Sequence, residues 1–261
     1  MGWKTLFNGT TGNQCNQCNQ SNQCNQCNPN DKSMSTAQSQ ITQSNTLTKS
    51  LTQSLQTFSK SISAGICILL GCVVNLSLSS TSKIAGAILF SVGLFAICSF
   101  GLNLYTGKAG HLLEMEHKLD TVIIWIGNFV GAFILGILVS FAKQSISSAA
   151  YNLMITKIHS LSYINIAVSS ICCGMLMYIA VDNFKSNKNT ISGIFGIVFC
   201  VTVFILSGFE HSIADIGYFG LAFRYMSLDE IIKSIVLIFN ISLFNAIGSI
   251  VLHYLVRQNS K

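Results

Sequence analysis

The pattern of apolar and polar positions divides the chain into a polar start and a long apolar remainder. Residues 1–60 are nearly free of apolar runs, whereas residues 61–256 are mostly apolar with short polar breaks. A helix needs about 20 apolar residues to cross a bilayer. Six segments are candidates, at about 61–79, 84–106, 119–142, 162–182, 190–218 and 231–256. The pattern therefore predicts an all-α membrane protein, with a transport domain of six transmembrane helices over residues 46–257.

Two of the six segments contain polar, glycine-bearing sequence at membrane depth. SFGLNLYTG closes the second segment, and SGFEHS interrupts the fifth. Such backbone is tolerated in a bilayer where it lines a cavity or is buried in protein. Asn128 in GNFVG and Asn245 in NAIGS lie in the third and sixth segments. Matching breaks in two halves predict two inverted three-helix repeats with broken second and fifth helices, and a transport site between them.

Composition and charge support a membrane domain. Hydrophobic residues make up 50% of the chain and charged residues only 9%, against about 25% charged residues in a typical soluble domain. If the six spans alternate, ten Lys and Arg residues lie on the side of the termini and five on the opposite side. Since cytoplasmic loops carry the excess of Lys and Arg, we expect a cell-membrane protein with both termini in the cytoplasm. Topology then explains the net charge of +6, and no nucleic-acid partner is expected.

Residues 1–45 are predicted to be a disordered, low-complexity cytoplasmic tail rich in Asn, Gln and Cys. Its NQC repeat holds Cys15, Cys18, Cys24 and Cys27 in a three-residue register. Two CxxC pairs resemble zinc ligands, but the repeat itself explains the spacing, and apolar residues that could surround a metal are missing. Metal or redox binding by the tail is the alternative interpretation.

Glu210, His211 and Asp215 lie within six positions at the break in the fifth segment. Ionisable groups at membrane depth are functional by default, and His211 is the group best suited to exchange a proton near neutral pH. Neighbours on a helix point about 100° apart, so we expect Glu210 to bond loop backbone or to face a neighbouring protomer. Asp215 follows His211 by four residues, so it either shares a face with His211 or faces an aqueous exit.

These motifs resemble those of the formate/nitrite transporter family. SGFEHSIAD resembles the family's fifth-segment signature, GAILFSVGLFAICSFGLNLYTG its second segment and the following break, and GNFVGA its third-segment motif. NAIGS is a weaker match to the sixth segment, and the resemblance covers about residues 45–256. It implies a homopentamer of six-helix protomers with an aquaporin-like fold. Each protomer would hold its own pore for formate, nitrite, hydrosulfide, acetate or lactate.

The resemblance also implies roles for particular residues. The family's central histidine corresponds to His211, its loop threonine to Thr106 and its vestibule lysine to Lys157. Its apolar constrictions correspond to Phe90, Leu94, Leu104 and Phe204. The chain departs from the family where asparagines are usual, at Asp215 and at Gly174 or Cys173, and it lacks the proline and second glycine of the sixth segment.

We therefore expect passive or proton-linked transport of small monovalent anions, with formate first. Lys157 would draw in the anion, Thr106 would set the loop, and His211 would donate or relay a proton, so that a neutral acid crosses the apolar constriction. Supporting or tuning roles are expected for Glu210, Asp215, Asn128 and Asn245.

The alternatives are a nitrite or hydrosulfide channel of the same fold and, more distantly, a membrane enzyme or a structural membrane protein. GxSG, HExxH and spaced carboxylate pairs are missing from the spans, so we expect no enzyme activity, no cofactor and no metal.

Overall fold

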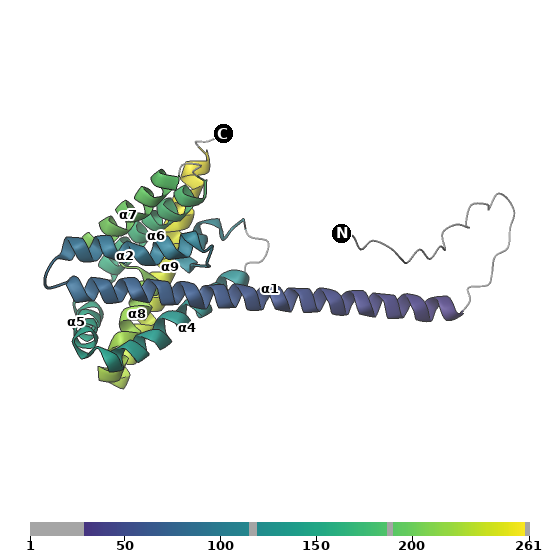
Figure 1. Ribbon diagram of the computed structural model, residues 1–261, viewed down its shortest axis with the longest axis horizontal. Helices are drawn as coiled ribbons and strands as arrows, with labels where there is room; N and C mark the ends of the chain where they lie inside the picture. The colour runs from purple at the N-terminus through teal and green to yellow at the C-terminus, as the bar shows by residue number, and fades with distance from the viewer. Residues whose placement is uncertain (1–28, 115–118, 187–189, 259–261) are drawn as a thin grey trace, which may run out of the picture. The chain divides into compact units, whose positions relative to one another are not determined.

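The computed structural model describes residues 29–114, 119–186 and 190–258, and their regular secondary structure is helical (Figure 1). The elements are α1 (Pro29–Leu78), α2 (Lys83–Ser99), α3 (Tyr105–Lys108), the 3-10 helix η1 (Ala109–His111), α4 (Leu119–Ala142), α5 (Gln144–Ser160), α6 (Tyr163–Ser186), α7 (Thr190–Leu206), α8 (Ser212–Ala222), the 3-10 helix η2 (Phe223–Tyr225) and α9 (Leu228–Gln258). The chain divides into two compact units, Met1–Thr48 and Lys49–Lys261. The helical bundle belongs to the second unit.

The NQC repeat of the tail lies outside the described residues. Helix α1 begins at Pro29, inside the stretch 1–45 for which the composition predicts disorder.

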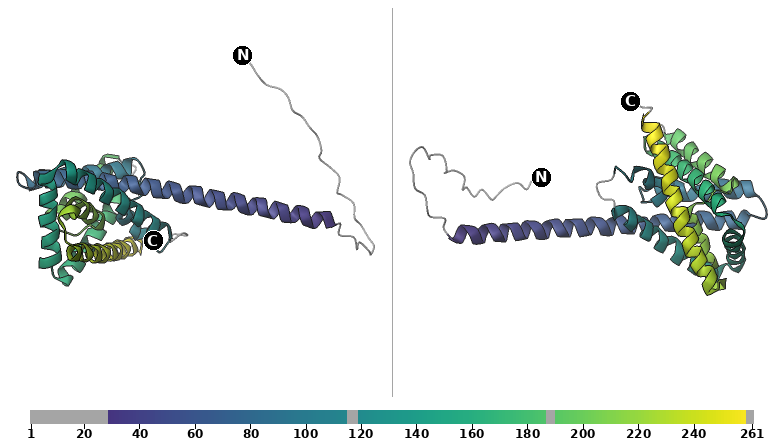
Figure 2. Two further views of the ribbon diagram at one scale, coloured as in Figure 1. Left: turned by 90° about the horizontal axis from the view of Figure 1, so that it is seen from below. Right: turned by 180° about the vertical axis from the view of Figure 1, so that it is seen from behind.

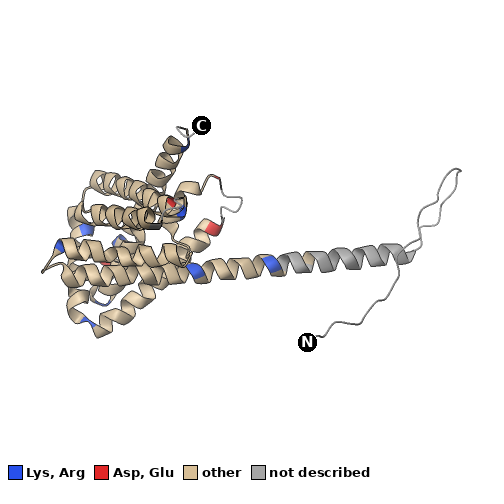
Figure 3. Ribbon diagram, turned by 45° about the horizontal axis from the view of Figure 1, so that its top comes forward, with Lys and Arg blue, Asp and Glu red and all other residues tan. Residues whose placement is uncertain are grey.

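Several helices are apolar enough to lie in a membrane. By length and composition, four helices could cross one, at Thr48–Leu78, Asp120–Ala142, Tyr163–Ser186 and Leu228–Gln258. Two shorter apolar helices lie at Lys83–Ser99 and Ile191–Leu206. Large apolar side chains such as Leu89, Phe195 and Phe199 are exposed on the bundle, where lipid can cover them. Most of the bundle is tan in Figure 3 because charged residues are few. The chain is a multi-pass membrane protein.

The connection between α4 and α6 contains a helix that the six apolar segments do not include. Helix α5 is formed by QSISSAAYNLMITKIHS, which is too polar to register as a span. Its buried residues recur at spacings of one, three and four, at Ile146, Ser147, Ala150 and Met154. This face packs against α8, where the Ser147 hydroxyl donates to the Leu221 carbonyl at 2.6 Å. A search for long apolar runs misses such a helix because only one of its faces is buried.

Helices α2 and α7 end in the same way, each at a glycine in the left-handed region. Gly101 has φ 62° and Gly208 has φ 66°, a conformation in which a side chain would be strained. The residue after each glycine, Leu102 or Phe209, donates its amide back to the helix, to Ile97 at 2.9 Å and to Phe204 at 3.0 Å. Such a C-terminal motif satisfies carbonyls that the helix end leaves open. Non-helical residues 100–104 and 207–211 follow the two helix ends.

Helix α8 lies inside the bundle, and each of its residues, Ser212–Ala222, is buried. It packs against α4, α5 and α9, while α6 packs against α7 and α9. Figure 2 shows α9, in yellow, running beside these green and teal helices. The packing holds the start of α8 in the centre of the bundle, next to the non-helical residues that precede it.

Candidate functional site

His211 stands directly before α8 and caps its N-terminus. Its backbone is extended, with φ −115° and ψ 111°. Its Nδ1 accepts a hydrogen bond from the Ala214 amide at 3.1 Å. A ring nitrogen that accepts carries no proton, so the neutral imidazole has its proton on Nε2. The cap therefore fixes both the orientation and the tautomer of a histidine that is only 2% exposed.

Thr106 meets His211 from the other chain break. It lies in α3, directly after residues 100–104, and it is fully buried. Its Oγ1 lies 2.9 Å from Nε2 of His211. With the Nε2 proton donated to Oγ1, the threonine hydroxyl keeps its own hydrogen for another acceptor. The pair can therefore present one donor to a small anion that has lost its water.

An apolar cluster lies against this polar pair. The Phe204 ring stacks on His211 with centroids 5.6 Å apart, and the edge of Phe90 packs on Phe204 at 5.6 Å. Leu94 and Leu104 are buried in the same core cluster as the two phenylalanines. The structure thus places Phe204 against the histidine and Phe90 against Phe204, while Leu94 and Leu104 are shown only to be buried in the same large core. Such a wall excludes water and raises the cost of an unpaired charge.

Asn128 of α4 forms hydrogen bonds at the first chain break, the non-helical residues 100–104 that follow α2. Its Oδ1 accepts the Tyr105 amide at 2.8 Å, while Nδ2 donates to the carbonyls of Ser61 at 2.7 Å and Asn103 at 2.8 Å. The side chain is fully buried. Non-helical backbone inside a membrane needs such partners, because no water satisfies its amides and carbonyls there.

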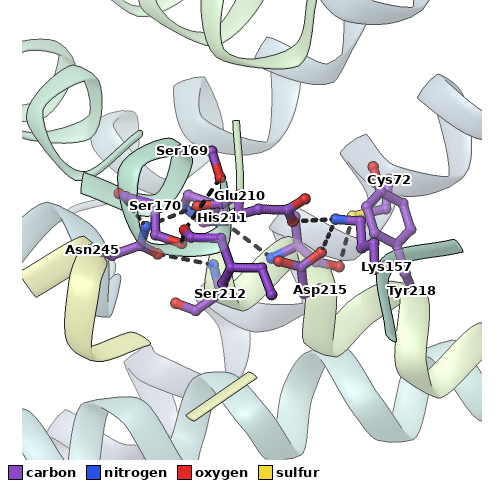
Figure 4. A network of polar contacts seen from close by, with 12 residues as sticks. Cys72, Lys157, Ser169, Ser170, Glu210, His211, Ser212, Asp215, Tyr218 and Asn245 are labelled. Carbon is purple, nitrogen blue, oxygen red and sulfur yellow. Dashed lines mark hydrogen bonds and ion pairs between the residues drawn. The ribbon is translucent and has the colours of Figure 1, made fainter. Parts of the chain in front are cut away.

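Asn245 of α9 forms the same pattern of hydrogen bonds at the second chain break, the non-helical residues 207–211 that follow α7. Its Oδ1 accepts the Ser212 amide at 2.9 Å, while Nδ2 donates to the carbonyls of Ser170 and Glu210, each at 2.8 Å. Figure 4 shows this amide bonded on both sides of His211. The two asparagines therefore fix the two helix starts that carry Thr106 and His211.

Lys157 of α5 is paired with two carboxylates. Its Nζ bonds Glu210 Oε2 and Asp215 Oδ1, and the three side chains are 11%, 5% and 1% exposed. Figure 4 shows both dashed contacts converging on the ammonium. With all three groups ionised, the cluster carries a net charge of −1. Oδ2 of Asp215 is buried and has no hydrogen-bond partner among the described residues.

This cluster differs from what the sequence predicts for its members. Asp215 neither shares a face with His211 nor faces an aqueous exit, since it is fully buried on Lys157. The four-residue spacing rule fails because His211 is an extended cap outside the helix. The side chain of Glu210 bonds Lys157 rather than loop backbone, because Glu210 lies in the break and not on a helix. Lys157 is not a free cation in a vestibule.

Sequence reasoning missed a second set of polar residues around this cluster. Asn75 Nδ2 donates to the Tyr218 hydroxyl at 3.3 Å, and the Lys157 ammonium lies 5.7 Å from the Tyr218 ring centroid. The Cys72 thiol donates to the Ala214 carbonyl at 3.6 Å. The signal was available in one case, because Asn75 is a polar residue in the first apolar segment.

Comparison with known proteins gives a consistent family assignment. The family model described as Formate/nitrite transporter matches residues 36–258. The chain is 25% identical to the formate channel FocA of Haemophilus influenzae over 60% of its own length and 63% of the relative's. It is 25% identical to FocA of Escherichia coli over 62% of its length and 64% of the relative's. The chain thus spans under two thirds of the length of these curated relatives.

Two solved structures share the fold. A pentameric formate channel with formate bound superposes with a TM-score of 0.67 at 20% identity, covering 79% of this chain and 97% of the channel. An FNT family ion channel superposes with a TM-score of 0.70 at 20% identity, covering 81% of this chain and 92% of the other. At this identity the likeness concerns the arrangement of the helices.

Proposed function

Because the chain belongs to the formate/nitrite transporter family, we propose that it moves small monovalent anions, formate first, across the cell membrane. The observation that carries the proposal is the buried contact between Thr106 and His211, where two chain breaks meet against an apolar wall. Donors held at membrane depth suit an oxyanion without its water. Formate comes first because the FocA relatives are named formate channels. Nitrite and hydrosulfide are the alternatives, with acetate and lactate behind them.

The proposed architecture has six spans in two inverted three-helix halves, with α2–α3 and α7–α8 as the broken second and fifth spans. The matching bonds of Asn128 and Asn245 support it, as do the matching glycine-terminated ends of α2 and α7. An even number of spans puts both termini on one side, which the Lys and Arg distribution makes the cytoplasmic side. We extend the proposal to a homopentamer with one pore in each protomer, and to a low-complexity tail over residues 1–45.

In the proposed mechanism, formate first accepts the free hydrogen of the Thr106 hydroxyl, and the Nε2–H of His211 then turns from Thr106 Oγ1 to the carboxylate. Proton transfer takes place at Nε2, because Nδ1 is occupied by the Ala214 amide. For a full relay the ring first takes a second proton from water on the side of entry, at Nδ1, which breaks the cap bond at a cost of about 1 kcal/mol; after the transfer, loss of the Nδ1 proton and uptake of one at Nε2 restore the starting tautomer. The charged ring then gives its Nε2 proton to the carboxylate. Formic acid crosses the wall that includes Phe90 and Phe204 more easily than formate does.

Lys157 acts in this proposal through its two carboxylates rather than as the first contact of the anion. Glu210 and Asp215 already occupy its ammonium. The cluster therefore sets the charge next to the pore, and each buried carboxylate that stays ionised repels an approaching anion. This arrangement favours passage as a neutral acid over passage as a bare anion.

The test is formate uptake into proteoliposomes that contain a pH-sensitive dye. The native chain is expected to acidify the lumen in step with formate entry. His211→Gln keeps an amide donor but cannot titrate, so uptake is expected to fall at least tenfold and acidification with it. His159→Gln, at the exposed end of α5, serves as the matched control. Native rates of uptake and acidification in His211→Gln would contradict the relay, and a native chain that moves none of the anions would contradict the proposed function.

A further inference from the structure

A second cluster of titratable side chains lies away from His211, where η1 meets α9. His111 ends η1, Glu114 follows in the next turn, and His253 lies near the end of α9. One ligand atom from each of the three residues lies within 4.8 Å of the other two. Two imidazoles and one carboxylate are a common ligand set for zinc.

His253 is the unusual member of this cluster. It is only 1% exposed, and neither ring nitrogen has a hydrogen-bond partner among the described residues. Nε2 lies 3.1 Å from Glu114 Oε1, at the distance of an ion pair. Burying a polar ring without partners is costly. A ligand bound at Nε2 would remove the part of that cost that falls on this nitrogen.

His111 is already oriented as a metal ligand would be. Its Nε2 lies 3.2 Å from Asp182 Oδ1, and Asp182 Oδ2 accepts from the Tyr178 hydroxyl at 3.4 Å. This leaves Nδ1 turned toward Glu114 Oε2, 3.8 Å away. Histidine ligands of metals commonly give their other ring nitrogen to a carboxylate, which fixes the tautomer and the ring.

We propose that His111 Nδ1, Glu114 and His253 Nε2 bind one divalent transition-metal ion of the zinc type, with water in the fourth position. Tetrahedral zinc with bonds of about 2.0–2.1 Å sets its ligand atoms roughly 3.3 Å apart. His253 Nε2 lies 3.1 Å from Glu114 Oε1, and His111 Nδ1 lies 3.8 Å from the other oxygen, Oε2, so each imidazole is near that spacing from one oxygen of the carboxylate. Small side-chain movements therefore complete the site.

Arg257 competes with the metal for the same carboxylate. Its Nη1 bonds Glu114 Oε1, and its side chain is 62% exposed. An exposed arginine can swing into solvent at little cost, since exposed ion pairs contribute about 0–1 kcal/mol. Metal binding would exchange this cation for a divalent one. Removing the arginine should therefore raise the affinity for zinc. If zinc were bound by residues other than Glu114, its affinity would not change.

The position of the cluster gives the metal a structural effect. η1 directly follows α3, the short helix that carries Thr106, and α9 carries Asn245. A metal bound by His111 and His253 would link η1, which follows the break at residues 100–104, to α9. Helix α9 in turn carries Asn245, whose side chain bonds the break at residues 207–211. This inference does not depend on which anion crosses, because its test measures metal binding.

The experiment titrates Zn²⁺ into EDTA-treated full-length protein in detergent, against a chelating indicator. Cys15, Cys18, Cys24 and Cys27 are replaced by serine throughout, so that tail thiolates do not compete. One tight equivalent per chain is expected. Glu114→Gln and His111→Ala should each weaken it at least tenfold, Arg257→Met should tighten it severalfold, and the exposed His159→Ala should leave it unchanged.

Co²⁺ provides a second readout, because four-coordinate cobalt with nitrogen and oxygen ligands absorbs strongly in the visible region. His253→Gln should lose these bands while its melting temperature without metal stays close to that of the parent. If His253→Gln fails to fold, the Glu114→Gln spectrum decides in its place. Absence of a tight equivalent in the parent, or equal affinity in His111→Ala and His159→Ala, overturns the proposal.

Discussion

The imidazole of His211 and the hydroxyl of Thr106 join two chain breaks that are 105 residues apart, through one contact of 2.9 Å. The histidine is held by the cap bond from Ala214. The threonine is held by the start of α3, where Asn128 receives the Tyr105 amide. The contact therefore depends on polar bonds in both breaks.

Replacing Thr106 with valine is expected to slow formate uptake about tenfold. Valine keeps the shape but removes the hydroxyl, which leaves the buried Nε2 proton of His211 without an acceptor at a cost of about 1–3 kcal/mol. Thr106→Ser keeps the hydroxyl and should retain most of the native rate. Uptake into proteoliposomes measures both variants, and equal rates for valine and serine would refute a role for the hydroxyl.

Replacing Asp215 with asparagine is expected to raise formate uptake at neutral pH, on the order of tenfold. The change removes one buried negative charge near the proposed pore and leaves Lys157 paired with Glu210. A charge several ångströms away in a protein interior shifts an anion's energy by about 1–2 kcal/mol. The control is Asp229→Asn, whose carboxylate is exposed and pairs with Lys233. A rate and pH profile identical to those of the native chain would show that Asp215 does not act on the anion.

Replacing Lys157 with methionine is expected to destabilise the folded protein by about 3–5 kcal/mol, because two buried carboxylates lose their cation. The double variant Lys157→Met/Asp215→Asn should recover part of this loss, since it removes one of the two charges. Lys233→Met breaks an exposed pair with Asp229 and should change stability by less than about 1 kcal/mol. Thermal unfolding in detergent ranks the variants, and a double variant no more stable than the single one would show that unpaired charge is not the cause of the loss.

Asn245→Ala and Asn128→Ala are expected to destabilise the protein to a similar extent, by about 3 kcal/mol or more each. Each removes three buried hydrogen bonds, and unsatisfied buried groups cost about 1–3 kcal/mol apiece. Asn240→Ala, at a half-buried position of α9, removes a bond within the helix and should have a small effect. The melting temperatures of the three variants give the comparison. A loss confined to one of the first two would argue against equivalent roles.

Replacing Phe204 with leucine should admit larger anions, so that acetate uptake rises relative to formate. The smaller side chain no longer fills the space between Phe90 and His211, and such a change costs about 1 kcal/mol of stability. Phe199→Leu on the same helix is exposed and should leave the ratio unchanged. An unaltered acetate-to-formate ratio would place the narrowest point of the pore elsewhere.

The apolar segments and the family were predictable from the sequence, because both are written in local patterns. Long apolar runs mark the spans, and the match over residues 36–258 confirms the resemblance carried by SGFEHSIAD. Helix α5 was not predictable in the same way, because its mixed composition resembles that of a loop.

The contacts of Asp215 and Glu210 were beyond sequence reasoning for another reason. Helical spacing rules were applied to residues around His211, but the chain is extended at the cap and helical only from Ser212. The spacing rules therefore apply from Ser212 onward but not to Glu210 and His211, which precede the helix. The partner of both carboxylates, Lys157, comes from α5, which the apolar pattern does not mark.

The bonds of Asn245 also bear on the order in which the protein is made. Ser212 and Glu210 emerge from the ribosome before α9, and their amide and carbonyl bond to a side chain in that last helix. Until α9 has entered the membrane, the start of α8 lacks the hydrogen bonds from Asn245. The backbone on either side of His211 is then not held in the position that places its ring next to Thr106. The centre proposed to conduct the anion is therefore expected to form late in biogenesis, and a nascent chain that stalls before Asn245 cannot complete it.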